Sequence, residues 1–171
     1  MKPALLRLVL TLEGAVRLSG VVAAWLCLVL VLLVAGDVLA RYLFKTGAVW
    51  AQELQWHLIS PIALFGMSYA LFSGEQVRVD VLFERFSPRL QQIVEVINGL
   101  LMIVLGVLLV MLSWNWVGMS YARGEGSPNP GGLPYRYILK AFIPLGFGLL
   151  ALQGLAHALR HAFALPPRAP A

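Results

Sequence analysis

Apolar stretches of this sequence contain two pairs of ionisable residues, and the two members of each pair lie four positions apart. Asp37 precedes Arg41, and Glu53 precedes His57. Side chains four residues apart share one face of an α-helix, so the members of each pair can interact directly. An acid before a base is the favourable orientation for a helical ion pair. An acid beside a histidine could instead relay a proton.

Each pair has a structural interpretation as well as a functional one. An Asp37–Arg41 ion pair would anchor the end of an apolar helix, or it would contact a partner subunit. Glu53 lies only about 5 Å along a helix from Trp50, which places it close to the start of its segment. We therefore expect Glu53 and His57 to form hydrogen bonds near interfacial water or to contact a partner subunit, with a proton relay as the alternative.

The three histidines, His57, His157 and His161, raise the question of a haem held between helices. His57 falls early in the second apolar segment and His157 late in the fourth, and alternate crossings run in the same direction. The two side chains then differ in depth by about 20 Å. His157 and His161 share one helix face and so cannot bind a haem iron from opposite sides. The sequence predicts no haem, and we expect no other cofactor and no metal site.

Sequence patterns of known catalytic sites are absent. The chain has no His-Glu-x-x-His, no phosphate-binding loop, no Gly-x-Ser-x-Gly and no cluster of paired acids deep in an apolar segment. We therefore predict no catalytic residues and a protein that is not an enzyme.

Four long apolar segments must position these side chains. A helix needs roughly 20 residues to cross a hydrocarbon core about 30 Å thick, and every segment is at least that long. Backbone polar groups find no water in lipid, so a continuous apolar run must cross as a helix. The sequence predicts a single-domain all-α membrane protein with four transmembrane helices and short amphipathic interfacial helices. The spans are expected at about residues 18–42, 50–72, 93–121 and 135–159.

Shorter amphipathic stretches flank the spans. Residues 4–17 and 79–90 carry apolar and charged side chains on different helix faces, which is typical of helices lying on a membrane surface. Ser87 followed by Pro88 indicates an N-cap with proline at the first helical position. The third helix is therefore expected to start at Pro88 and, at about 50 Å, to tilt or project beyond the bilayer. The proline-rich tail at 166–171 is expected to be disordered.

Composition excludes a sizeable soluble domain. The chain is 60% hydrophobic and 12% charged, with a mean hydropathy of +0.81. The net charge of +5 comes from basic residues at segment ends, without a dense Lys/Arg block, so we expect the lipid bilayer and not nucleic acid as a partner. Eight Lys and Arg residues fall on one side of the membrane and five on the other, which predicts that both termini are cytoplasmic.

Short motifs at defined places among the four spans resemble those of one transporter family. They are Asp37-Val-Leu-Ala-Arg41-Tyr42, Trp50-Ala-Gln-Glu53-Leu54, Gly74-Glu-Gln-Val-Arg78-Val-Asp80 and Glu125-Gly-Ser-Pro-Asn-Pro-Gly-Gly-Leu133-Pro134. In order and placement, across nearly the full chain, the sequence resembles the small membrane subunit of tripartite ATP-independent periplasmic (TRAP) transporters, the DctQ-type family. Members often carry two adjacent acids in the second motif, whereas this chain has Gln52 before Glu53, which weakens any role for a paired acidic site.

The resemblance implies a scaffold rather than a transport pathway. Small subunits of this family pair with a large permease subunit of about twelve spans, which binds the substrate and the coupling sodium ions. A soluble periplasmic solute-binding protein delivers the substrate, commonly a carboxylate. We thus expect a non-catalytic subunit for organic-acid uptake in a bacterial inner membrane, with the large subunit and the solute-binding protein as partners.

The motifs and the spacing of ionisable groups together select candidate residues. The candidates for subunit contact or structure are Asp37, Arg41, Trp50, Glu53, His57, Arg78 and Asp80. The candidates for a periplasmic loop that docks the solute-binding protein are Glu125, Ser127, Pro128, Gly132, Leu133 and Pro134. Two other functions stay open: the haem- or quinone-linked membrane anchor of a respiratory complex, and a small transporter or channel that acts alone.

Overall fold

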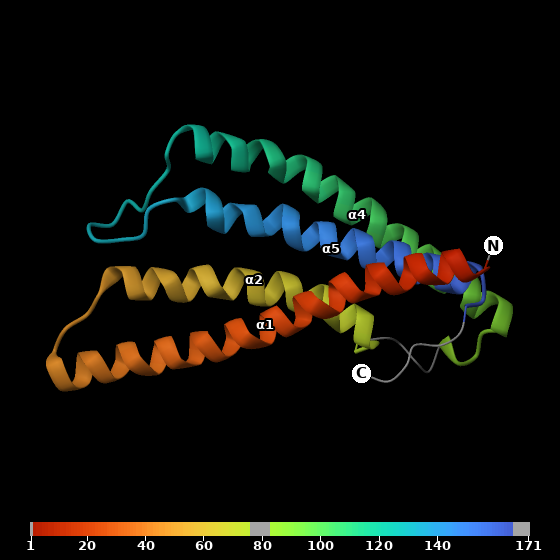
Figure 1. Ribbon diagram of the computed structural model, residues 1–171, viewed down its shortest axis with the longest axis horizontal. Helices are drawn as coiled ribbons and strands as arrows, with labels where there is room; N and C mark the ends of the chain where they lie inside the picture. The colour runs from red at the N-terminus through yellow and green to blue at the C-terminus, as the bar shows by residue number, and fades with distance from the viewer. Residues whose placement is uncertain (1, 76–82, 166–171) are drawn as a thin grey trace.

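The computed structural model describes residues 2–75 and 83–165, in which four long helices dominate (Figure 1). Their bounds are α1 Lys2–Phe44, α2 Val49–Ser73, α4 Pro88–Ala122 and α5 Arg136–Ala162. The described residues contain no β-strand, so the all-α prediction is confirmed.

The helices form two hairpins, α1 with α2 and α4 with α5, and both hairpins turn at the same end of the molecule (Figure 1). We term this the loop end; it holds residues 45–48 and the α4–α5 connection, residues 123–135. The opposite end, where α1 begins and α5 ends, is the terminal end. Side chains from both hairpins can therefore meet at either end, although they are far apart in the sequence.

All four helices are long and apolar enough to cross a membrane. The shortest, α2, has 25 residues, which corresponds to about 38 Å at the helical rise. Each expected span coincides with one of these helices, so the four-span prediction is confirmed. With 43 and 35 residues, α1 and α4 are longer than a bilayer requires and must tilt or project from it.

The N-terminal part of α1 differs from the separate surface helix that we expected. Residues 4–17 continue without a break into the first span, so α1 is a single helix. Val9 and Val16 are fully buried and Glu13 is 5% exposed, which means that this part packs against the rest of the protein. Packing of this face stabilises the helix through the expected junction.

The ends of α2 and α4 follow signals in the sequence. Gly74 ends α2 in the left-handed conformation (φ 81°), which glycine adopts without steric cost, and its N–H donates to the Ala70 carbonyl. Ser87 caps α4, and its hydroxyl accepts a hydrogen bond from Leu90 N at 3.4 Å. The expected start of the third helix at Pro88 is therefore confirmed.

The expected interfacial helix at 79–90 lies partly outside the described residues. The residues not described are 76–82, which include Arg78 and Asp80, and the tail at 166–171. The described part of the interfacial stretch ends in a turn followed by the first residues of α4. The predicted helix therefore does not reach its expected end, because a newly capped helix begins there.

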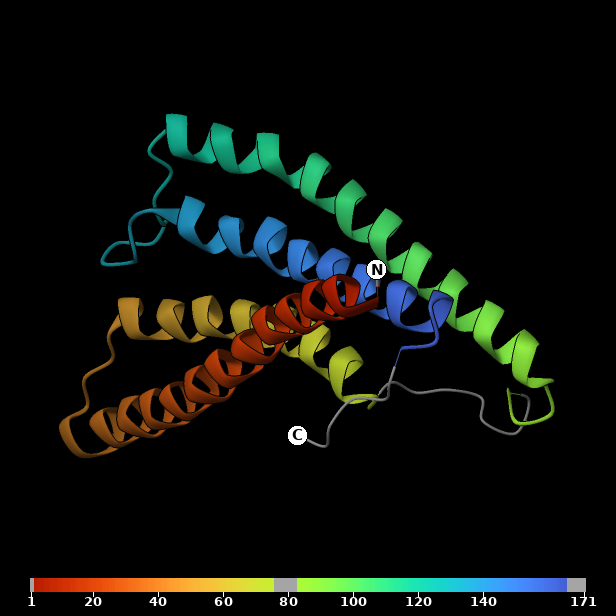
Figure 2. The same ribbon diagram turned by 45° about the vertical axis from the view of Figure 1, so that its right-hand side comes forward.

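Helix α5 is the central element of the fold. It contacts α1, α2 and α4, whereas α4 packs chiefly on α5 (Figure 2). Glycines let α4 and α5 approach closely: a Cβ at Gly106 would lie 2.6 Å from the Phe147 carbonyl oxygen, and one at Gly99 would lie 2.8 Å from Ala158 N. Small residues therefore set the spacing of the second hairpin.

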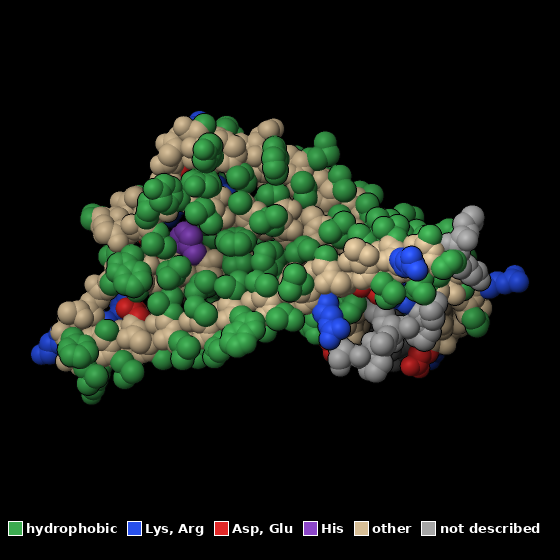
Figure 3. Space-filling model, viewed as in Figure 1, with side chains coloured by type: hydrophobic (Ala, Val, Ile, Leu, Met, Phe, Trp, Pro, Cys, Tyr) green, Lys and Arg blue, Asp and Glu red, His purple; other side chains and the backbone are tan. Residues whose placement is uncertain are grey.

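Polar and apolar side chains are distributed in the opposite sense to a soluble protein. Large apolar side chains cover the outer surface, and many on α1 and α4 are more than half exposed (Figure 3). Among the described residues, the buried polar and charged ones are Glu13, Ser19, Glu53, Ser68, Glu95, Ser113, Ser120, Gln153, His157 and Arg160. Lipid suits the apolar exterior, and the buried pairs Glu13–Arg160 and Glu95–His157 form between helices.

The close approach at Gly106 makes this position sensitive to one added methyl group. Gly106→Ala places that group 2.6 Å from a backbone oxygen of α5, so α4 and α5 must move apart. We expect a loss of about 1–3 kcal/mol of stability, as in other overpacked interiors, measured as a lower unfolding temperature of the full chain in detergent. Gly118→Ala is the matched control, because a Cβ at Gly118 meets nothing within 4 Å. Equal unfolding temperatures for the two variants would contradict the role given to Gly106.

Candidate functional site

Glu53 is the centre of the polar contacts at the loop end. It lies near the start of α2 and is 2% exposed. Its carboxylate accepts hydrogen bonds from the Ser127 hydroxyl, from Asn129 Nδ2 at 3.0 Å and from Leu133 N at 2.7 Å. All three donors belong to the α4–α5 connection, so one side chain of the first hairpin holds the turn of the second. Hydrogen bonds to an ionised acceptor are among the stronger ones in proteins.

The α4–α5 connection is shaped to fit around this carboxylate. Ser127 N donates to Leu133 O at 3.0 Å, which closes the connection on itself. Gly131 has φ 77°, a left-handed conformation that favours glycine. A Cβ on Gly132 would lie 2.7 Å from a carboxylate oxygen of Glu53, so the backbone can approach this closely only at a glycine. The glycines in this part of the sequence are therefore needed for the contact with α2.

Glu125 secures the base of the same connection. Its carboxylate accepts hydrogen bonds from Lys140 Nζ on α5 and, at 2.7 Å, from the Ser120 hydroxyl on α4. Arg136 N also donates to Glu125 O, at 2.9 Å. The Lys140 ammonium, followed by the Ser120 hydroxyl, holds the pKa of Glu125 below its ordinary value. The carboxylate therefore stays ionised at neutral pH and joins the ends of both helices.

The candidate loop residues occupy two sides of the connection. Ser127, Gly132 and Leu133 are partly buried and face Glu53, and the side-chain amide of Asn129 also reaches Glu53, whereas Pro128, Pro130, Gly131 and Pro134 are exposed on the other side. The connection thus has an inner side bound to α2 and an outer side open to a partner. Its docking role stays a prediction.

Glu53 and His57 do not meet through their side chains. The His57 ring donates from Nδ1 to the backbone carbonyl oxygen of Glu53, 2.7 Å away. The Glu53 carboxylate is engaged with the α4–α5 connection instead. His57 Nε2 is buried and has no hydrogen-bond partner within the part of the chain that the structure describes. This geometry does not support a proton relay between the two side chains.

Asp37 and Arg41 form a helical ion pair, with Arg41 Nη2 2.7 Å from Asp37 Oδ2. Gln55 of α2 approaches the same oxygen at 3.4 Å. Asp37 and the half-exposed Trp50 line a groove of about 370 Å³ at the loop end, between α1 and α2. Contact of this groove with a partner subunit stays a prediction.

The terminal end holds two buried contacts of acidic residues that the sequence did not lead us to expect. Arg160 of α5 donates to Glu13 of α1, from Nε at 3.0 Å and from Nη2 at 2.6 Å. His157 Nε2, also on α5, lies 2.8 Å from Glu95 Oε2 on α4. The available signal was that Glu13 and Glu95 are isolated acids on apolar helices, where a charge requires a buried partner.

These contacts join segments of the chain to one another. The carboxylates of Glu13, Glu53, Glu95 and Glu125 each bind a group from another helix or from the α4–α5 connection. Such a carboxylate cannot act as a base or bind a substrate without losing those internal contacts. The fold and these contacts define a multi-pass helical membrane protein whose charged groups join its own segments.

Comparison with known proteins gives the family. Residues 30–164 match the model of the family described as tripartite ATP-independent periplasmic transporters, DctQ component, and the chain belongs to this family. It is also 30% identical, over 117 residues, to the isethionate TRAP transporter permease protein DctMQ of Oleidesulfovibrio alaskensis. That match covers 67% of this chain but only 18% of the relative.

The resemblance inferred from four short motifs is thereby confirmed. The family consists of transporter components rather than enzymes. Its membership favours a transport role over the respiratory membrane anchor that the sequence had left open.

Removal of the Glu53 charge should loosen the α4–α5 connection and leave the helices intact. Glu53→Gln keeps the shape of the side chain but replaces one acceptor oxygen with an NH2 group that faces hydrogen-bond donors. We expect amide hydrogen exchange at Leu133, whose N–H binds this carboxylate, to accelerate by about fivefold or more. Glu75→Gln, at an exposed position just after the end of α2, should leave that exchange unchanged. Unaltered exchange at Leu133 in Glu53→Gln would show that Glu53 does not hold the connection.

Proposed function

We propose that the chain is the small, non-catalytic permease subunit of a TRAP-type secondary transporter that imports an organic acid. The observation that carries this proposal is that the buried carboxylates bind groups within the chain itself. A translocation path needs polar groups that face a cavity near the middle of the membrane. Polar groups that join segments of one chain suit a rigid scaffold. Substrate binding and sodium coupling then belong to a larger subunit.

The partner we propose is a large permease subunit of about twelve spans. The outer faces of α1 and α4 support this partner, since Trp25 and Leu32 are 64% and 63% exposed, and Met111 and Trp114 are each 68% exposed. Such faces pack against apolar partner helices as readily as against lipid. The groove beside Asp37 offers a recess for a partner side chain at the loop end.

We further propose that both termini are cytoplasmic and that the loop end faces the periplasm from a bacterial inner membrane. The excess of Lys and Arg on the side of the termini, eight against five, supports this orientation. In this orientation, the exposed residues 128–131 face a soluble solute-binding protein. The Glu53 contacts favour docking there, because a surface that is already ordered loses less entropy on binding.

For the substrate we propose an organic acid, with sodium as the coupling ion. The relative is named for isethionate, and that assignment belongs to the relative. The family indicates a transporter that depends on a periplasmic component. In such a system, the solute-binding protein and the large subunit select the substrate, while the small subunit supports them.

Affinity purification of this chain in a mild detergent tests the scaffold role. We expect a large permease subunit to co-purify in stoichiometric amount, identified by mass spectrometry, because the apolar faces of α1 and α4 pack on it. The chain alone in liposomes should transport no organic acid. A chain that purifies alone, or with a respiratory partner and a haem absorbance band, would contradict the proposal.

Changes at the outer side of the α4–α5 connection test docking of the solute-binding protein. Pro128→Ser combined with Pro130→Ser alters only exposed residues and leaves the donors to Glu53 in place. We expect uptake at limiting solute-binding protein to fall by about tenfold, as for the loss of an interface hot spot. Lys45→Gln, an exposed residue in the other turn of the loop end that does not line the groove beside Asp37, is the control and should leave uptake unchanged. Normal uptake by the Pro128/Pro130 variant, with the subunit still assembled, would rule out docking at this surface.

A further inference from the structure

Three potential metal ligands meet at the terminal end, far from Glu53. His157 and His161 lie one turn apart on α5, and their ring centroids are 4.5 Å apart. Glu95 reaches them from α4, with Oε2 2.8 Å from His157 Nε2. One ligand atom from each of the three residues lies within 4.8 Å of the other two. Two imidazole nitrogens and one carboxylate oxygen thus converge on one small region.

Backbone packing holds the two helices at this separation. Gly99 lies one turn after Glu95, and a Cβ there would lie 2.8 Å from Ala158 N on α5. One turn before Glu95, Gln92 Nε2 donates to the carbonyl oxygen of His161 at 2.6 Å. These two contacts flank Glu95 along α4. The ligands are therefore carried on a backbone that is already in position, as an effective metal site requires.

The surrounding charges are compatible with a bound cation. Glu95 and His157 are 5% and 6% exposed, so the cluster lies where charges are weakly screened. The guanidinium of Arg160, between the two histidines in sequence, donates two hydrogen bonds to Glu13. The Glu13 carboxylate thereby balances the positive charge nearest to the cluster in the sequence.

We propose that Glu95, His157 and His161 bind a divalent transition-metal ion, with Zn²⁺ as the best fit. Imidazole nitrogen together with carboxylate oxygen suits zinc and its neighbours, whereas Mg²⁺ and Ca²⁺ prefer oxygen ligands alone. Three protein ligands leave the fourth tetrahedral position to water. Zinc–ligand bonds are about 2.0–2.2 Å long. The side chains rotate to bring the three ligand atoms to this distance from the ion, and the helices stay in place. The bound ion joins α4 to α5.

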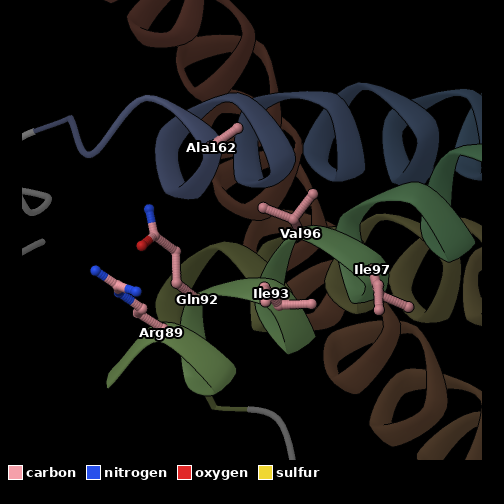
Figure 4. A pocket seen from close by; sticks show the side chains of 6 residues that line it. All are labelled: Arg89, Gln92, Ile93, Val96, Ile97 and Ala162. Carbon is pink, nitrogen blue, oxygen red and sulfur yellow. The ribbon is translucent and has the colours of Figure 1, made fainter. Parts of the chain in front are cut away.

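An open pocket lies beside residues that neighbour this cluster in sequence, although none of the three proposed ligands lines it. The pocket has a volume of about 470 Å³, and Gln92 rises from α4 along it toward the end of α5 (Figure 4). Ala162, the residue after His161, lines it as well. His161 itself is partly exposed. Arg89 also lines the pocket, but it lies six residues before Glu95 and hence on another turn of α4.

Zinc titration of the purified full chain tests the site. The chain is prepared in mild detergent with a tag that contains no histidine, stripped with a chelator and titrated with ZnCl2 against a chromophoric chelator. We expect one zinc ion per chain and a raised unfolding temperature, because the ion binds the folded state. Co²⁺ in the same site should give the visible absorption bands of a tetrahedral site. Failure of the wild-type chain to bind zinc under these conditions would overturn the proposal.

Variants distinguish this cluster from other metal-binding groups. His161→Ala removes the partly exposed ligand, and Glu95→Gln removes the charge but keeps an amide able to bond to His157. Each should weaken zinc binding by at least about tenfold and abolish the rise in unfolding temperature. His57→Ala, which removes the histidine at the loop end, should bind zinc like the wild type. With helix content unchanged by circular dichroism, equal zinc binding in all variants would mean an adventitious ion only and would overturn the proposal.

Discussion

A charged side chain between helices in lipid has no water to stabilise it, so it must find its partner inside the protein. In this chain, buried carboxylates meet that constraint by binding groups on other segments. Glu53 binds the α4–α5 connection, Glu95 binds His157, and Glu13 binds Arg160. Each contact joins parts of the chain that are far apart in sequence. The arrangement of the two hairpins therefore depends on these contacts.

Close helix packing at glycines holds α4 and α5 together in addition to the charged contacts. Gly106, along the second hairpin, and Gly99, close to the terminal end, bring α4 against the backbone of α5, where each Cβ would meet α5 within 3 Å. Polar contacts then fix the two ends, with Glu53 at the loop end and Glu13 and Glu95 at the terminal end. Apolar contacts of this kind have little direction of their own in lipid, so the paired charges determine how the helices are rotated.

The two ends differ in what they leave available to partners. At the loop end, the inner side of the α4–α5 connection is bound to α2, and the outer side, with Pro128, Pro130 and Gly131, is exposed. At the terminal end, the charged groups lie between α1, α4 and α5. A body fixed at both ends and apolar outside suits the stationary scaffold of a membrane transporter, which is the role we propose for this member of the DctQ family.

The sequence by itself determined the four helices and the Ser87 cap, because length, hydropathy and capping depend on residues close together in the chain. It also identified the family through short motifs. It did not reveal that α1 is continuous, nor that Glu53 binds residues 74 to 80 positions later. Those contacts depend on how the helices pack and rotate against one another. Only the tertiary structure could therefore show that Glu13 and Glu53 link the two hairpins and that Glu95 links α4 to α5 within the second one.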